Sequence, residues 1–179
     1  MSRIAPVVPE DVDAATGSTL TQLKVKLGKV PNGLATLAHS AVALEGYLAL
    51  SKILSRGRLN ARQREIVALA IAQANECQYC LSFHTASSTK AGLSPVDILD
   101  ARAAQNDDPF EHAVAAFAVK VVQLRGLVPE TDFAAARQSG LDHDLMLEIV
   151  ANVALQTLMN YSNRLADTDI DFPVVQVQL

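Results

Sequence analysis

The sequence predicts an all-α fold in a single domain of about eight helices. Hydrophobic residues recur every three or four positions in several stretches, which is the period of a helix. Glycine, proline and helix-capping residues divide these stretches at short intervals. No segment before the last ten residues alternates hydrophobic and polar residues as a strand would. A chain of 179 residues is long enough to bury one sizeable core.

The helices are delimited by start and stop signals taken in order along the chain. Residues 8–11 combine a proline with two acids, which is typical of a helix start, and residues 28–33 form a break. Further helices are expected at residues 40–56, 61–74, 75–91, 94–103, 108–126, 129–140 and 142–165. The last ten residues, IDFPVVQVQL, are β-branched and interrupted by proline, so we expect an extended C-terminal tail.

Composition and charge exclude several classes of protein. Hydrophobic residues make up 50% of the chain, but no uncharged run reaches the length of a membrane-spanning helix. The net charge is −4 and the basic residues are scattered, which argues against a nucleic-acid partner. The N-terminus lacks the hydrophobic core of a signal peptide, so a cytoplasmic location is expected. The hydrophobic excess predicts burial in a subunit interface, and hence a homo-oligomer.

The only two cysteines of the chain, Cys77 and Cys80, are separated by two residues. In a reducing compartment this spacing indicates redox or metal chemistry rather than a structural crosslink. A disulfide that closes so short a loop would also constrain the unfolded chain very little.

Both cysteines are predicted to lie in the first turn of a helix that Asn75 caps, with Gln78 completing a capping box. Unpaired backbone N–H groups and the helix dipole stabilise a thiolate there. His84 follows Cys80 by four residues, so Cys77, Cys80 and His84 share one face of the helix. An imidazole at this distance can exchange a proton with a sulfur atom.

Glu65 lies on a helix that is hydrophobic on nearly every face, which predicts that the helix is buried. A carboxylate carried into a core needs a partner or a raised pKa, and either suits proton relay. A straight helix would place Glu65 about 18 Å from Cys77. We therefore expect the chain to turn back near residues 75–76 and to bring His84 toward Glu65.

Together, Glu65, Cys77, Tyr79, Cys80 and His84 form the pattern E-x11-C-x-Y-C-x3-H. This pattern resembles the AhpD-like alkylhydroperoxidase branch of the carboxymuconolactone decarboxylase superfamily. The segments KLGKVPNGLATLAHS and NYSNRLADTDIDFPVV are similar to its peroxidase-related subgroup. The resemblance covers essentially the whole chain. It implies one AhpD-like domain over residues 1–179, with a redox core at about 40–125.

The resemblance also implies a function for each residue of the pattern. Cys80 would attack an organic hydroperoxide, Cys77 would resolve the product as a disulfide, and Glu65 and His84 would move protons. A homotrimer or homohexamer, a dithiol reductant of the lipoyl type and no cofactor are implied as well. Tyr79 stands where related enzymes carry another histidine. Arg164 follows Asn163 where many relatives have Asn-His.

Other interpretations of the same residues remain open. Cys77, Cys80 and His84 would supply three ligands of a zinc site, although no fourth ligand is evident. Glu65 could be a buried acid paired with the backbone, Arg62 or Arg64. A non-catalytic redox sensor, a metal-binding protein and a lactone decarboxylase-like enzyme are the alternative functions.

Overall fold

The computed structural model describes residues 2–179, and within that range all regular structure is helical. The predicted all-α class is confirmed. Two 3-10 turns, Pro9–Asp11 and Thr89–Ala91, accompany nine α-helices. These are α1 (Ala14–Leu27), α2 (Asn32–Leu37), α3 (Ala41–Leu54), α4 (Ala61–Ala74), α5 (Gln78–Ser88), α6 (Pro95–Ala103), α7 (Pro109–Gln123), α8 (Glu130–Gln138) and α9 (His143–Ala166).

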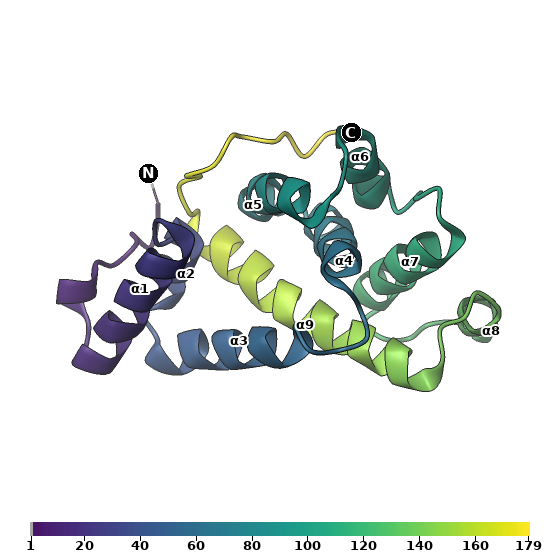
Figure 1. Cartoon of the computed structure of the whole chain (residues 1–179), viewed down its shortest axis with the longest axis horizontal. Coiled ribbons are helices and arrows are strands. Elements are labelled where there is room, and N and C mark those ends of the chain that lie inside the picture. The colour runs from purple at the N-terminus through teal and green to yellow at the C-terminus, as the bar shows by residue number, and fades with distance from the viewer. Residues whose placement is uncertain (1) are drawn as a thin grey trace.

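The helix α4 forms the centre of the molecule and packs against α5, α6, α7 and α9 (Figure 1). Residues 66–72 of α4 are all buried, because this helix is hydrophobic all round and has neighbours on every side. The long helix α9 crosses the molecule from α8 to the region of α1 and α2 (Figure 1). It therefore contacts both the α4–α7 side and the α2–α3 side of the fold.

The N-terminal region differs from the expected single helix start. Residues 9–11 form only a short 3-10 turn, and α1 begins after Asp13. The Asp13 carboxylate accepts hydrogen bonds from the backbone N–H groups of Ala15 and Thr16, which is the geometry of an N-cap. The expected break at residues 28–33 runs into the short helix α2, which the sequence did not predict.

The turn between α4 and α5 occurs where it was predicted, but the expected cap was wrong. Asn75 ends α4, and its side-chain amide donates to Asn160 Oδ1 instead of capping the next helix. Glu76 adopts a left-handed conformation with φ of 52°, which reverses the chain. Cys77 is the N-cap of α5, because its Sγ accepts the backbone N–H of Cys80.

The extended C-terminal tail runs from the end of α9 across α5 to α6 (Figure 1). Ser82 Oγ accepts the backbone N–H of Val175 at 3.0 Å. Arg102 Nη2 donates to the carbonyl oxygen of Gln176 at 2.7 Å. Hydrophobic side chains of the tail pack against the cysteine-bearing turn of α5. The tail therefore covers the outer side of α5.

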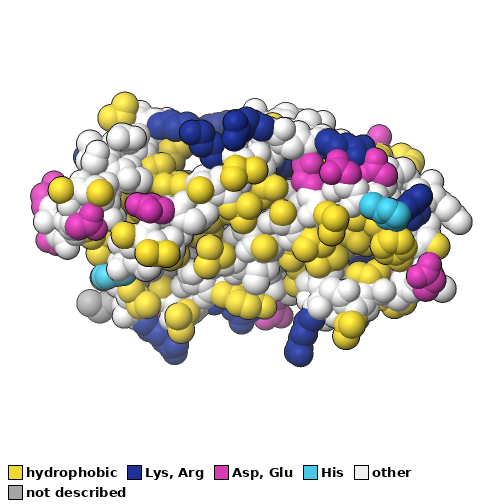
Figure 2. All heavy atoms as spheres, turned by 90° about the horizontal axis from the view of Figure 1, so that it is seen from below, with side chains coloured by type: hydrophobic (Ala, Val, Ile, Leu, Met, Phe, Trp, Pro, Cys, Tyr) yellow, Lys and Arg dark blue, Asp and Glu magenta, His cyan; other side chains and the backbone are white. Residues whose placement is uncertain are grey.

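Large hydrophobic side chains are exposed along α3 and α9. They are Val42, Ile53, Leu147, Val150, Leu158, Tyr161 and Leu165. Seen from below, the face of the molecule where α3 and α9 run is largely hydrophobic, with most charged side chains toward its edge (Figure 2). Among residues 2–179, no helix is both long enough and hydrophobic enough to span a membrane.

Candidate active site

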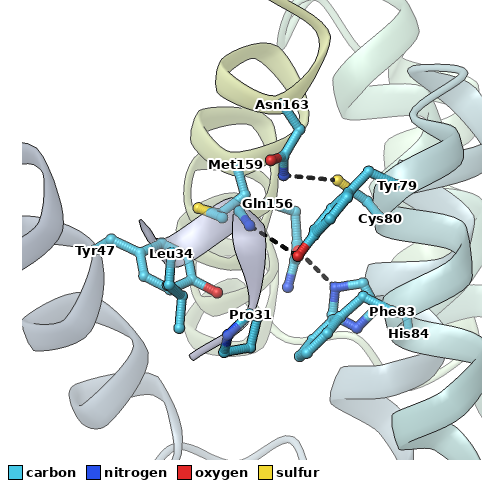
Figure 3. A pocket seen from close by; sticks show the side chains of 11 residues that line it. Pro31, Leu34, Tyr47, Tyr79, Cys80, Phe83, His84, Gln156, Met159 and Asn163 are labelled. Carbon is cyan, nitrogen blue, oxygen red and sulfur yellow. Dashed lines mark hydrogen bonds between the residues drawn. The ribbon is translucent and has the colours of Figure 1, made fainter. Parts of the chain in front are cut away.

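A small pocket lies between α5, α9, α3 and the loop that leads into α2 (Figure 3). Its volume is about 40 Å³, which holds only a few water-sized groups. The lining is mostly hydrophobic, with a few polar groups. The lining residues are Pro31, Gly33, Leu34, Tyr47, Tyr79, Cys80, Phe83, His84, Gln156, Met159 and Asn163.

The two cysteines are joined by a disulfide bond at the start of α5. Both are almost completely buried, with 1% of Cys77 and 4% of Cys80 exposed. Of the two cysteines, only Cys80 lines the small pocket. The side-chain amide of Asn163 on α9 donates to Cys80 Sγ at 3.5 Å (Figure 3). A donor in this position would stabilise negative charge on Cys80 after the disulfide is reduced.

His84 and Glu65 form an ion pair across the α4–α5 contact, with His84 Nδ1 2.9 Å from Glu65 Oε2. Ser87 and Ser88 also donate to that carboxylate oxygen, at 2.8 and 3.3 Å. Burial opposes ionisation of Glu65, but the positive charge of His84 and the three hydrogen bonds outweigh it. The pKa of Glu65 is consequently lowered from its usual value.

The second ring nitrogen of His84 faces Gln156 on α9, with Nε2 3.1 Å from Oε1. Both neighbours of the ring present oxygen atoms, so a doubly protonated imidazole satisfies both of them. A neutral His84 would require the Gln156 amide to turn its NH₂ group toward Nε2.

The hydroxyl group of Tyr79 is used in hydrogen bonds that hold segments of the fold together. Its hydroxyl donates to Asp171 Oδ1 at 3.0 Å and accepts the backbone N–H of Gly33 at 2.8 Å. A Cβ atom at Gly33 would lie 2.8 Å from both the Tyr79 ring and Asn163 Oδ1. Glycine is therefore needed where α2 approaches the pocket, and Tyr79 connects α2 to the tail.

Tyr47 on α3 contributes a hydroxyl group that has no hydrogen-bond partner within residues 2–179. Its side chain reaches from α3 toward the part of the pocket that holds Tyr79, Cys80 and His84 (Figure 3). Burial, with a further contribution from the Glu65 charge, raises the pKa of Tyr47 to about 12. The phenol thus remains protonated near neutral pH and is free to donate a hydrogen bond.

The structure brings together the four residues that were expected to be catalytic. Cys77 is bonded to Cys80, Cys80 and His84 line one pocket, and Glu65 contacts His84. Tyr47, Gln156 and Asn163 also line the pocket but lie outside the sequence pattern. Gln156 and Asn163 belong to a row of four buried amide residues on the inner face of α9, together with Asn152 and Asn160, and that row was the available signal. No comparable signal marked Tyr47.

Glu65 is paired with neither Arg62 nor Arg64. Arg62 instead forms ion pairs with Asp97 and Glu111, and Arg64 donates to the carbonyl oxygen of Leu59. Within the described residues, no group of three or more His, Cys, Asp or Glu side chains is arranged to hold a metal ion.

Comparisons with known proteins bear on the family and the fold of this chain. Residues 37–123 match the model of the carboxymuconolactone decarboxylase family. A curated alkyl hydroperoxide reductase of Mycobacterium tuberculosis is 27% identical over 93 residues. The match covers 51% of this chain but spans only 27% of the length of that protein.

Solved structures show the same architecture over nearly the whole chain. An AhpD-core, peroxidase-related protein from Ralstonia eutropha is 26% identical, with a TM-score of 0.84 over 95% of this chain and 92% of that one. The debrominase Bmp8 shares the fold at 20% identity, with a TM-score of 0.77 over 94% and 91% of the two chains. The family model, the curated relative and the helical architecture agree: residues 37–123 carry a carboxymuconolactone decarboxylase family region, and the chain has an AhpD-like fold.

Proposed function

We propose that this protein is a thiol-dependent peroxidase that reduces organic hydroperoxides. The observation that carries the proposal is the disulfide-bonded Cys77–Cys80 pair, whose Cys80 opens on a pocket beside the His84–Glu65 ion pair. The pocket is mostly hydrophobic and small, which suits a hydroperoxide group attached to an organic substituent. The name of the Mycobacterium tuberculosis relative supports the same activity.

In the first step the Cys80 thiolate attacks the terminal oxygen of the hydroperoxide. An S–O bond forms, the O–O bond breaks, and Cys80 becomes a sulfenic acid. The alkoxide that leaves takes up a proton and departs as an alcohol. His84, held by Glu65, exchanges the proton that Cys80 must lose to become a thiolate.

In the second step the Cys77 thiolate attacks the sulfur of the Cys80 sulfenic acid. An S–S bond forms, and hydroxide leaves and is protonated to water. The two electrons that reduced the peroxide now have to be replaced. A dithiol supplies them by thiol–disulfide exchange, which returns both cysteines to thiols and leaves the reductant as a disulfide.

We propose that the Tyr47 hydroxyl, which lines the same pocket as Cys80, donates a hydrogen bond to the oxygen atom that leaves in the first step. Tyr47→Phe removes only the hydroxyl group, so we expect the rate of peroxide reaction with the pre-reduced protein to fall about tenfold, the effect of one lost charge-assisted hydrogen bond. Stopped-flow oxidation by cumene hydroperoxide measures this rate. Tyr161→Phe is the control, because Tyr161 on α9 does not line the pocket. Equal rates in the two variants would show that the Tyr47 hydroxyl takes no part in the reaction.

The proposal as a whole is tested by turnover of hydroperoxides with dithiothreitol as reductant. Sustained consumption by the wild-type protein is expected. A single stoichiometric oxidation without turnover would instead favour a redox sensor. A ring lactone and a brominated pyrrole belong in the same panel, because the superfamily includes decarboxylases and the fold is shared with a debrominase. The redox-active cysteine pair argues against lactone decarboxylation, which needs no dithiol.

We also propose that the exposed hydrophobic side chains of α3 and α9 form the interface of a homotrimer or homohexamer. Leu147→Asp on α9 should then dissociate the assembly, because it would bury a carboxylate without a partner. Light scattering at micromolar concentration measures the mass. Leu127→Asp, at an exposed leucine outside both helices, is the control. A monomeric wild-type protein would contradict the proposal. A cytoplasmic location and the absence of a cofactor remain predictions.

A further inference from the structure

A second pocket lies on the other side of the cysteine pair, between the start of α5 and the end of α9. Its volume is about 240 Å³, six times that of the pocket next to Cys80. The lining residues are Glu76, Cys77, Gln78, Tyr79, Asn163, Arg164, Asp167, Thr168 and Ile170. Cys77 lines this pocket and Cys80 does not, whereas the reverse holds for the smaller pocket. The disulfide therefore separates two pockets.

This second pocket is lined by a buried hydroxyl group that has no partner. Thr168 is only 7% exposed, and its hydroxyl has no hydrogen-bond partner in the described part of the chain. The unpaired Oδ1 of Asn163 lies instead next to Gly33, on the side of the smaller pocket. Buried polar groups without partners are rare, and the Thr168 hydroxyl is therefore a candidate contact for a ligand.

The start of α5 adds two unpaired donors. Within residues 2–179, the backbone N–H groups of Gln78 and Tyr79 donate to no group, as is usual for the first turn of a helix. These N–H groups and the positive end of the helix dipole stabilise an anion that approaches Cys77. A thiolate is the anion that reacts with a disulfide.

We propose that this pocket is the access site of the thiol reductant, and that the reductant attacks Cys77. The inference rests on the proposed function, because only a recycled disulfide needs a reductant. A thiolate in the pocket bonds to Cys77 Sγ, the Cys77–Cys80 bond breaks, and Cys80 leaves as a thiolate. The second thiol of the reductant then attacks the mixed disulfide, so that Cys77 is released and the reductant leaves as a disulfide.

The direction of attack follows from what surrounds each sulfur. Each sulfur accepts one hydrogen bond, but only Cys77 lines the larger pocket, so a thiolate in that pocket reaches Cys77. Cys80 can then leave as a thiolate, because Asn163 Nδ2 donates to its Sγ and stabilises the negative charge that develops there. Cys80 is also released into the pocket where the next hydroperoxide binds. Substrate and reductant thus use opposite sides of the pair, and neither has to leave before the other approaches.

The attacked sulfur can be identified in the wild-type protein without any peroxide. The oxidised protein is treated with 2-mercaptoethanol, the released thiol is alkylated at once with iodoacetamide, and the peptide is fragmented in a mass spectrometer. We expect 2-mercaptoethanol on Cys77 and the alkyl group on Cys80. The opposite arrangement would overturn the proposal. Hydroperoxide activity does not enter this experiment, so failure of the proposed function and failure of this inference are distinguishable.

A variant of the pocket supplies the second measurement. Thr168→Val keeps the shape of the side chain and removes its unpaired hydroxyl, and we expect reduction of the disulfide by dithiothreitol to slow at least threefold. The rate of oxidation of the pre-reduced variant by hydroperoxide should be unchanged. Thr36→Val, at an equally buried threonine whose hydroxyl is also unpaired, is the matched control. Equal reduction rates in both variants would contradict the assignment of this pocket.

Discussion

Cys80→Ser is expected to reduce hydroperoxide turnover to the uncatalysed background. Serine keeps the size of the side chain, but its hydroxyl is not ionised near neutral pH and cannot replace the thiolate as nucleophile. The fold should survive, because a disulfide that closes a three-residue separation adds little to stability. Consumption of cumene hydroperoxide in the presence of dithiothreitol measures the loss.

Cys77→Ser is the matched variant, and its expected result differs in kind. It retains the attacking thiolate, so one equivalent of hydroperoxide should be consumed per chain before the reaction stalls with Cys80 as a sulfenic acid. Dimedone labelling and mass spectrometry locate that sulfenic acid. A sulfenic acid trapped on Cys77 of the Cys80→Ser variant would reverse the two assignments.

Glu65→Gln is expected to lower turnover at neutral pH about a hundredfold, within the usual contribution of a group that takes part in proton transfer. Glutamine preserves the size of the side chain and a contact with His84, but it carries no negative charge and accepts no proton. Turnover and the pH profile of kcat/KM should both change. A purely structural Glu65 would leave the pH profile unaltered.

Glu111→Gln is the control for this variant. Glu111 is also a largely buried acid, but it pairs with Arg62, away from the pocket. It should fold and turn over normally. The pKa of Glu65 is lowered in the folded protein, so its ionised form stabilises the fold above the usual value of 4.5. This stabilisation is lost as the pH falls through the lowered pKa. Urea unfolding should show the loss in the wild type and not in Glu65→Gln.

The sequence predicted most of the fold because the helix signals are local. The bounds of α4 and α6 agree with those expected from capping residues and hydrophobic period, and α4 is buried as its composition required. The errors arose where a longer-range contact replaced a local one. Asn75 was expected to cap α5, but its amide pairs with Asn160 on α9, which is 85 residues away. Such a partner is invisible to a local rule.

In the candidate site too, the residues related by local spacing could be predicted, and those brought together by tertiary packing could not. The spacing of Cys77, Cys80 and His84 follows from one helix, so the sequence could place them on one face. The contact between Glu65 and His84 required the predicted turn at the end of α4, and the structure has that contact. Tyr47 and Gln156 come from α3 and α9, and their position beside α5 depends on how α9 packs against both α3 and α5. No periodicity in the sequence reports that arrangement.

The N-cap of α5 is itself one of the two reactive sulfur atoms. Cys77 Sγ accepts the backbone N–H of Cys80 while it is part of the disulfide. A thiolate accepts a hydrogen bond more strongly than a neutral sulfur does, so reduction tightens the first turn of the helix. The amide proton of Cys80 is therefore expected to report on the redox state of the cysteine pair. Its NMR resonance should shift, and its exchange with solvent should slow, each time the protein passes from the oxidised to the reduced form.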